Sequence, residues 1–339
     1  MGIDINKSDF LTGYNFARLA NIVFDETVTI DQFNKLRSEN LLIKNKNKSY
    51  ISYKVKNIRI NDGSIIYASP ASLDHLFFYL NKLRDVKSVT LVTSQTDRSI
   101  DKSVYEKKPK CVKKWFATNV NFEAEDLVPL PLGLANNYSS KNLLPKDFLS
   151  TRENSQKEDK LYINFQVNTN INERKNILES FVNYDWVVNK EPNLKLQEYK
   201  NDLINYKFVL CPWGNGYDTH RLWETLYAGS IPVTKYHTTY KCLENLPVIF
   251  VKDFSDISYD YLMDSLKKLN NLNYEKLNIN YWKNQFFESS VSNGEYEEIK
   301  NNFYLDTSFF YKRKIETYFY KKIKSINYYL RQIFKKLNN

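Results

Sequence analysis

The sequence predicts an α/β protein built from two lobes, the second of which contains a doubly wound parallel sheet. Segments with strand and helix patterns alternate from residue 160 to residue 251, and a shorter alternation runs from residue 64 to residue 134. Such alternation is typical of βαβ units, in which right-handed helical crossovers join parallel strands. A polar stretch without periodicity, residues 151–160, is the expected linker. The expected parts of the chain are a first α/β lobe at 1–150, a second Rossmann-like lobe at 151–290 and a helical tail at 291–339.

The first series consists of short apolar segments around one clear helix. The expected elements are strands at 64–68 and 88–94, a helix at 69–83, a strand or helix start at 113–119 and a proline-broken apolar segment at 126–134. Before residue 61 the pattern is weaker. It indicates only a short amphipathic helix at 15–24 and a strand or hairpin at 48–60.

The second series is more regular. Its expected strands are 160–165, 185–189, 207–211, 231–234 and 247–251, and its expected helices are 170–181, 194–204, 219–229, 240–246, 258–270 and 273–289. Ligands of open parallel sheets bind beyond the carboxyl ends of the strands. The loops that follow these strands are therefore the places to look for a site.

Composition and charge exclude several classes of protein. The three cysteines, Cys111, Cys211 and Cys242, show no CxxC or Cys/His spacing, so we expect neither disulfides nor a zinc site. The first ten residues lack the pattern of a signal peptide, and no stretch approaches the ~18 apolar residues of a membrane-spanning helix. The net charge is +10, but residues 309–339 hold nine basic residues and one acidic residue. The body is therefore near neutral, and we expect no nucleic-acid-binding surface.

The segment from Lys207 to Thr234 carries the densest group of polar residues between apolar strands. The loop PWGNGYD follows the strand 207–211, and its glycines permit a tight turn and a close backbone approach to a ligand. Asp218 or Thr219 is expected to cap the next helix, whose first N–H groups favour an anion.

Helical geometry divides the side chains after this loop into two groups. At 100° per residue, Leu222, Trp223 and Leu226 fall on one side and are expected to pack on the sheet. His220, Arg221 and Glu224 gather on the other side, near the helix start. An arginine there suits a diphosphate, and a carboxylate one turn later suits two ribose hydroxyls. The alternatives are a capping aspartate, a surface ion pair between arginine and glutamate, and a histidine that satisfies a core hydrogen bond.

The segment GNGYDTHRLWETLYAGSIPV resembles the signature of exostosin-like glycosyltransferases and related xylosyl- and bacterial polysaccharide transferases, GNG-x-D-x-HR-x-WE-x-L-x-x-G-x-x-PV. More distantly, it is similar to a fucosyltransferase motif with a basic residue and a carboxylate at the positions of Arg221 and Glu224. Weaker similarities lie at 91–97, 115–119, 128–134 and 163–177. Trp213 departs from the family, which often has an arginine at this position.

This resemblance implies a GT-B-like fold, with two Rossmann-like lobes facing a cleft, and transfer of a hexosyl or pentosyl group from a nucleotide-diphosphate sugar to a glycan hydroxyl. It implies an inverting enzyme that needs no metal and no other cofactor. The sequence likewise shows no convincing D-x-D carboxylate pair. The implied donor-binding residues are Asn215, Gly216, Asp218, Thr219, His220, Arg221, Glu224 and Arg174. A solvated helical charge is the alternative role for Arg174.

An inverting displacement needs a base for the acceptor hydroxyl. We expect this base in the first, acceptor-side lobe. Asp97 is the choice, because it follows the buried strand 88–94 at its carboxyl end. Asp74, His75 and Glu123 are the other candidates, and a helix cap or loop position is the alternative role for Asp97. Arg221 is expected to stabilise the leaving diphosphate.

The tail has apolar residues at spacings of three and four, which indicates an amphipathic helix with a basic face. These residues are Ile315, Phe319, Ile323, Ile326, Leu330, Ile333 and Leu337. We expect residues 309–339 to bind an anionic membrane surface carrying lipid-linked glycan acceptors, on the cytoplasmic inner face of a bacterial cell membrane. The alternatives are a helix packed on the body and a coiled-coil dimer seam. For the whole chain, the alternatives are a fucosyltransferase-like enzyme that uses a GDP-sugar and a non-catalytic scaffold that binds a nucleotide sugar.

Overall fold

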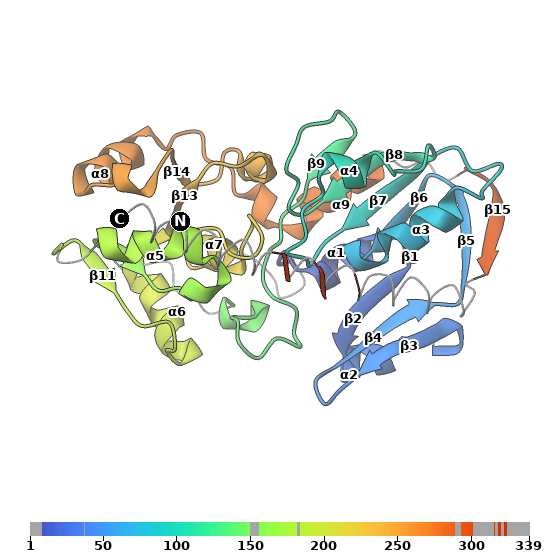
Figure 1. Ribbon diagram of the computed structural model, residues 1–339, viewed down its shortest axis with the longest axis horizontal. Coiled ribbons are helices and arrows are strands. Elements are labelled where there is room, and N and C mark those ends of the chain that lie inside the picture. Colours follow the sequence, from blue (N-terminus) through green and yellow to red (C-terminus); the bar gives the residue numbers. More distant parts are fainter. Residues whose placement is uncertain are drawn as a thin grey trace.

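The computed structural model describes residues 9–36, 38–149, 156–181, 184–288 and 293–300, together with positions 315, 318, 319, 322 and 323. Within these residues the protein is a mixed α/β structure with two five-stranded parallel sheets. The two sheets and their helices form two lobes that lie side by side in Figure 1. No helix in this described part of the chain has both the length and the apolar character needed to cross a membrane.

The sheet of the first lobe has the order β1-β6-β7-β8-β9. Its strands are β1 (Ile22–Val23), β6 (Ser64–Ala68), β7 (Val89–Thr93), β8 (Val112–Ala117) and β9 (Leu127–Pro129). The helices of this lobe are α1 (Gly13–Leu19), α3 (Leu73–Leu80) and α4 (Lys102–Tyr105). Every residue of β6 and β7 is buried, as expected for central parallel strands that are covered on both faces.

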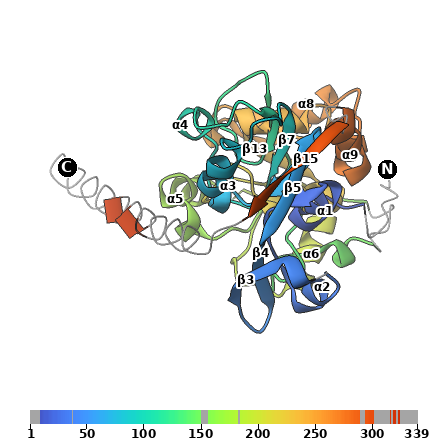
Figure 2. The ribbon, with the colours of Figure 1, turned by 90° about the vertical axis from the view of Figure 1, so that its right-hand side faces the viewer.

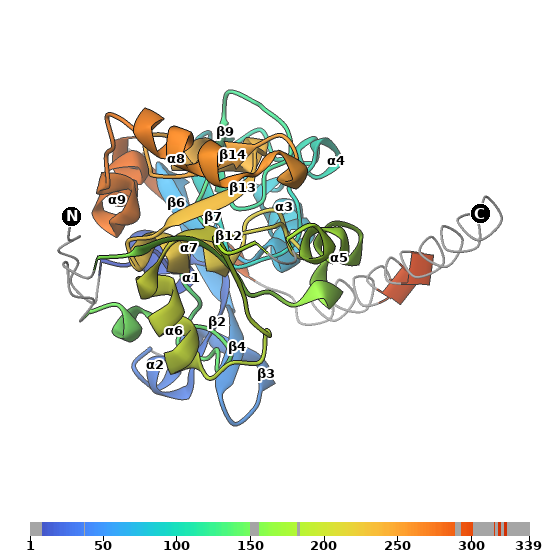
Figure 3. The same ribbon diagram turned by 90° about the vertical axis from the view of Figure 1, so that its left-hand side faces the viewer.

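The sheet of the second lobe has the order β11-β10-β12-β13-β14. Its strands are β10 (Glu158–Ile163), β11 (Val187–Asn189), β12 (Tyr206–Leu210), β13 (Ile231–Lys235) and β14 (Ile249–Val251). Its helices are α5 (Ile171–Ser180), α6 (Leu196–Asn205), α7 (His220–Tyr227) and α8 (Tyr259–Lys268). Side chains alternate across β12, so that Val209 packs with α6 and α7 whereas Phe208 and Leu210 pack with α5 and α8. Figure 3 shows α6 and α8 on opposite sides of this sheet.

The structure adds elements that the weak pattern of the first 60 residues does not predict. A three-stranded antiparallel sheet, order β2-β4-β3, extends the first lobe, and β15 pairs with β5 in antiparallel fashion (Figure 2). The strand or hairpin expected at 48–60 is confirmed as two strands, β4 (Tyr50–Val55) and β5 (Asn57–Asp62). The elements that were not predicted are β2 (Asp25–Thr29), α2 (Ile30–Asn34), β3 (Leu41–Lys46) and β15 (Asn293–Lys300). Short 3-10 helices are η1 (Ser38–Asn40), η2 (Pro70–Ser72), η3 (Pro145–Asp147), η4 (Val167–Thr169), η5 (Thr238–Leu243), η6 (Phe254–Asp256) and η7 (Glu275–Leu277).

Most expected elements are confirmed within a few residues, and three differ. The strand alternative for residues 113–119 is confirmed as β8, whereas the helix expected at 273–289 is divided into the 3-10 helix η7 and the helix α9 (Ile279–Glu288). The helix expected at 240–246 is the 3-10 helix η5. Residues 293–300, expected in the helical tail, form β15 because the unpaired edge of β5 accepts them as a partner strand. Half of the expected linker 151–160 and most of the tail lie outside the described residues, and the linker's last three residues belong to β10.

One hydrophobic core joins the two lobes. It includes Phe116 of β8 in the first lobe and Trp223 of α7 in the second, both fully buried. Helix α9 (Ile279–Glu288) carries the chain back to the first lobe, where the ring of Phe286 lies 4.6 Å from that of Phe116. The expected second lobe, 151–290, therefore includes a helix that packs on the first lobe, because α9 covers apolar residues that the first sheet leaves open.

Candidate functional site

The loop between β12 and α7 lies at the topological switch point of the second sheet. Strand β10 pairs with β11 on one side and with β12 on the other, so the chain reverses direction across the sheet at the β10–β12 boundary. Ligands of doubly wound sheets bind in the crevice at this point, beyond the carboxyl ends of the strands. The segment 211–219, with its two glycines, leaves β12 at this end.

The side chain of Arg174, in α5, holds this loop in place by donating hydrogen bonds. Its Nε donates to the carbonyl of Trp213 at 2.8 Å, and its Nη2 donates to the carbonyl of Pro212 at 2.9 Å. Its Nη1 donates to the carbonyl of Gln166 and to the hydroxyl of Thr169. These bonds hold the segment after β10 against the segment after β12. They leave Arg174 little capacity for the second phosphate contact expected from the sequence, and that role stays a prediction.

Arg221, in the first turn of α7, is a partly buried cation with free hydrogen-bonding capacity. Its Nη1 is inaccessible to water and has no partner among the described residues. The guanidinium carbon lies 5.1 Å from the centre of the Tyr199 ring. Burial, together with the nearby charge of Arg221, lowers the pKa of Arg174 to about 10. Two neighbouring guanidinium groups, one of which has a buried nitrogen without a partner among the described residues, form a place where an anion is favourable.

Gly216 packs directly against the first lobe. A Cβ atom built there would lie 2.9 Å from Nδ2 of Asn119 and 3.1 Å from the Cα of Asp97. Only a glycine permits this approach, which places the Asp97 backbone beside the loop of the second lobe. Asn215 is exposed between the two glycines, and no hydrogen bond of its side chain is present among the described residues. The structure thus brings Asp97 and the loop together.

Asp218 links the two lobes. It is 1% exposed, and its Oδ2 accepts from the N–H of Leu132 at 2.8 Å while Trp223 Nε1 donates to both carboxylate oxygens. Its own N–H donates to Oδ1 of Asn119 at 2.8 Å. Burial raises the pKa of Asp218 to about 7, although hydrogen bonds from Leu132, Trp223 and Thr219 oppose this shift. All of these bonds are internal, so donor contact by Asp218 stays a prediction.

Thr219 and His220 begin α7. Thr219 is the N-cap residue, but its side chain makes no capping bond, and its buried Oγ1 has no partner among the described residues. His220 Nδ1 lies 2.7 Å from the carbonyl of Gly133. Because a carbonyl only accepts, Nδ1 donates in this contact, and Nε2 is the ring nitrogen left for a ligand. Both residues therefore retain a group that a ligand can use.

Glu224 is placed differently from the helical projection. It is 3% exposed, its Oε1 accepts from the N–H of Leu143 at 3.3 Å, and its Oε2 accepts from the hydroxyl of Tyr199 at 2.9 Å. Leu143 belongs to the segment between the two sheets, which covers this side of α7. Both oxygens are thus engaged by the protein, and the expected ribose contact stays a prediction.

Two of the other base candidates, His75 and Glu123, each contact a lysine. His75 is 3% exposed and lies in hydrogen-bond contact with the buried Lys54. Glu123 forms an ion pair with Lys241 of the second lobe at 2.7 Å. Of these two, only Glu123 touches the other lobe.

An aromatic group beside the loop was not singled out from the sequence. The rings of Tyr217 and His237 are stacked, with centres 3.6 Å apart, and Trp213 meets both edge-on. Burial lowers the pKa of His237 to about 4, so the ring is neutral near pH 7. In the sequence, the signal for this aromatic group was the position of His237, which lies two residues beyond the carboxyl end of β13.

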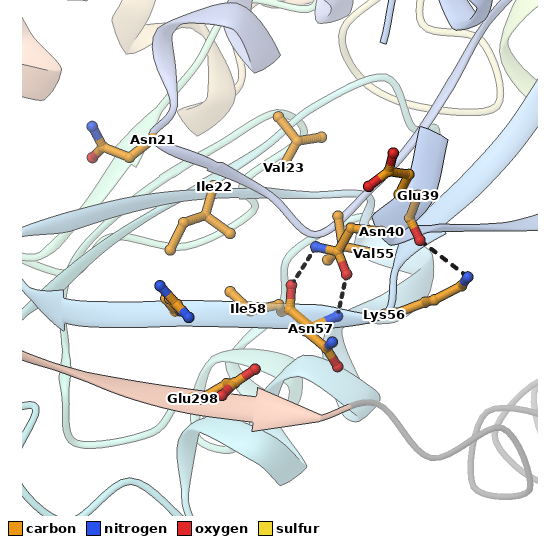
Figure 4. A pocket seen from close by; sticks show the side chains of 11 residues that line it. Asn21, Ile22, Val23, Glu39, Asn40, Val55, Lys56, Asn57, Ile58 and Glu298 are labelled. Atoms are coloured by element: carbon orange, nitrogen blue, oxygen red, sulfur yellow. Dashed lines mark hydrogen bonds between the residues drawn. The ribbon is translucent and has the colours of Figure 1, made fainter. Parts of the chain in front are cut away.

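Two cavities lie in the first lobe or at its boundary. One, of about 600 Å³, lies between β1, β5 and β15 and is shown in Figure 4. Its wall includes Glu39 and Lys56, and Asn40 and Asn57 are joined there by two hydrogen bonds. None of the expected site residues lines it. The other, of about 390 Å³, is lined by both lobes and includes the Glu123–Lys241 pair.

Comparison with known proteins identifies one related family. Residues 136–303 match the family model of the RXYLT1 C-terminal domain. This is an exostosin- and xylosyltransferase-related glycosyltransferase family, and the match supports a glycosyltransferase family for this chain. The matched region contains the loop, Arg174 and all of α7. No curated protein matches the sequence.

Proposed function

We propose that the protein transfers a sugar from a nucleotide-diphosphate donor to a hydroxyl of a glycan, with the donor held at the β10–β12 switch point. The supporting observation is Arg221, whose Nη1 is buried and unpartnered beside a second guanidinium group. The matched family supports glycosyltransferase activity. Two parallel sheets joined by a common core are compatible with a GT-B arrangement.

The proposed reaction is an inverting displacement. The acceptor oxygen attacks the anomeric carbon, the bond from that carbon to the diphosphate oxygen breaks, and its electron pair leaves on the diphosphate. Arg221 and the first N–H groups of α7 stabilise the charge that develops on the leaving group, which is the task of a metal ion in metal-dependent transferases. The acceptor proton passes to Asp97, whose backbone adjoins Gly216.

Replacing Asp97 by asparagine tests the proposed base. Because an amide cannot take up the acceptor proton, we expect the rate of transfer to fall by about 100-fold or more while nucleotide binding is retained. Steady-state kinetics and a binding titration measure the two quantities. Near-normal turnover by a correctly folded Asp97→Asn protein would exclude Asp97 as the base.

A thermal-shift panel of UDP-, GDP-, CMP- and dTDP-sugars tests the donor class. We expect a UDP-, GDP- or dTDP-sugar to raise Tm in proportion to the logarithm of its concentration, because a ligand that binds only the native state stabilises it. The CMP-sugar carries a single phosphate and should have no effect. The sugar-free nucleoside diphosphates serve as controls for the contribution of the sugar. The absence of any shift across the panel would contradict the proposal, and a shift with GDP-sugars alone would indicate the fucosyltransferase-like alternative.

A non-catalytic nucleotide-sugar-binding protein is the second candidate. It is favoured by the internal hydrogen bonds of Glu224 and Arg174, which leave fewer groups for the donor than the motif implies. The two candidates differ in turnover. Binding without either hydrolysis or transfer of the sugar would support the second candidate.

We further propose that the enzyme acts in bacterial surface polysaccharide synthesis, attached to the cytoplasmic face of the membrane through residues 309–339. At the described positions of this segment, Ile315, Tyr318, Phe319 and Ile323 are each more than half exposed. Together with the excess of basic residues, this favours an anionic lipid surface.

Deleting residues 309–339 tests the membrane proposal. We expect the full chain to sediment with vesicles that contain anionic phosphatidylglycerol and the truncated chain to remain in the supernatant. Neutral phosphatidylcholine vesicles and added salt are the controls, since electrostatic attraction to lipid is screened by ions. Equal sedimentation of the two proteins would contradict the proposal.

A further inference from the structure

The cavity of about 390 Å³ at the boundary of the lobes has walls from two distant parts of the chain. Phe122, Glu123, Glu125 and Pro129 are among the residues from the first lobe, and Thr238 and Lys241 come from η5 of the second lobe. Its volume lies within the ~300–1,000 Å³ typical of sites for small organic ligands. It is therefore large enough for a ring with several hydroxyl groups.

The residues that line this cavity are close in the chain to residues that contact the loop of the proposed donor site. On the second lobe, Thr238 follows His237, whose ring stacks on Tyr217, and the hydroxyl of Tyr240 donates to the carbonyl of Tyr217 at 2.6 Å. On the first lobe, Phe122 lies three residues after Asn119, which accepts a hydrogen bond from the N–H of Asp218. Both walls are thus held in place by groups that also position the loop.

The side chains that line the cavity favour a sugar ring over a diphosphate. Two carboxylates and one ammonium group line the cavity, so its charge is negative, and a diphosphate is disfavoured there. Carboxylates accept hydrogen bonds from pairs of hydroxyls, and Phe122, Leu127 and Pro129 offer apolar surface to the C–H face of a sugar ring. Glu125 has no partner among the described residues, which leaves both of its oxygens available.

The ion pair between Glu123 and Lys241 closes one side of the cavity. Its Nζ and Oε2 atoms are 2.7 Å apart, and the two side chains are 64% and 47% exposed. Exposed pairs of this kind are weak, so a ligand hydroxyl can replace either partner at small cost.

We infer that this cavity binds the acceptor as a neutral, polyhydroxylated saccharide ring, with Glu125 and Glu123 receiving hydrogen bonds from its hydroxyls. The inference rests on the proposed function for the identity of the ligand as acceptor. It assigns the donor to a site with two guanidinium groups and the acceptor to a cavity with two carboxylates.

Saturation-transfer NMR with a panel of methyl glycosides (glucoside, galactoside, xyloside and N-acetylglucosaminide) tests this inference on the full chain. We expect at least one glycoside to bind. Glu125→Gln should weaken this binding about tenfold, because a charged acceptor of hydrogen bonds is lost. Ala124→Trp, which fills the cavity, should abolish it. The matched control is Glu106→Gln, an exposed carboxylate on the first lobe outside the cavity.

Titration of UDP and GDP into the same proteins separates the possible outcomes. Unchanged nucleotide affinity with lost glycoside binding supports the inference. Loss of nucleotide affinity in Ala124→Trp would assign the cavity to the nucleotide and overturn the inference. Glycoside binding that is equal in all variants, or absent from the unmodified protein, would overturn it. Glycoside binding without any nucleotide binding would instead contradict the proposed donor site alone.

Discussion

Replacing Arg221 by alanine will weaken the binding of a nucleoside diphosphate about 100-fold, because truncating one side of a desolvated charge pair costs roughly 2–5 kcal/mol. The effect is expected to be large because Nη1 is already buried and unpartnered in the ligand-free protein. Isothermal titration calorimetry with the diphosphate identified by the thermal-shift panel measures this loss.

Two further variants separate charge from shape at this position. Arg221→Lys keeps the charge but loses the planar fork, so we expect an intermediate affinity. Arg84→Ala removes an exposed arginine of the first lobe and is the matched control, which should bind as the unmodified protein does. Equal affinity of Arg221→Ala and this control would contradict the placement of the diphosphate. Tm without ligand should be compared for all proteins, so that lost binding is distinguished from lost folding.

Replacing Asp218 by asparagine will destabilise the protein by about 2 kcal/mol at pH 8, because it disrupts a buried hydrogen-bond network. The carboxylate accepts from Leu132 of the first lobe and from Trp223 of its own lobe. An amide has one accepting oxygen, and its NH2 group would face one of these donors. Chemical denaturation measures the free energy of unfolding, and the exposed Asp185→Asn is the matched control.

The difference in unfolding free energy between the unmodified protein and Asp218→Asn should also depend on pH, and the raised pKa of Asp218 fixes the direction of this dependence. The pKa of Asp218 is raised from 3.8 to about 7 in the folded protein, so between these values the folded state holds a proton that the unfolded state has released. The stability that the protonated Asp218 contributes to the folded state is present at low pH and is lost as pH rises from about 4 to about 7. The difference in unfolding free energy between the unmodified protein and Asp218→Asn should therefore grow by up to about 1.4 kcal/mol for each unit of pH decrease in this window. A difference that is constant with pH would show that the carboxyl keeps an ordinary pKa.

The regular elements of the second lobe were predictable because their patterns are strong. Strand β12 is an apolar run, and α7 has a clear apolar side on which Leu222, Trp223 and Leu226 are buried. The elements that were missed have polar sequences. Strand β3 has four exposed residues at its end, and β15 contains two glutamates in succession. Such strands at the edge of a sheet carry little apolar periodicity, because at most one face is covered.

The site was predictable in its location but not in the roles of its members. The position of Arg221 near the helix start follows from the sequence alone. The burial of Glu224 does not, because it depends on Leu143, which is 81 residues away in the chain and covers a side of α7 that the helical projection leaves open. The same is true of Asp218, whose partner Leu132 belongs to the other lobe. Local periodicity describes one helix and contains no information about which distant segment will cover it.

The return of the chain to the first lobe has a consequence for folding during synthesis. Phe286 belongs to the core that includes Phe116, and β15 supplies the antiparallel partner of β5. A nascent chain released from the ribosome as far as residue 250 contains all ten strands of the parallel sheets except the end of β14, yet it still lacks these last pieces of its first lobe. Domains generally fold as units in the order in which they are made. Here the lobe that is translated first is finished last, so the two lobes are expected to reach their native state in a single, late step.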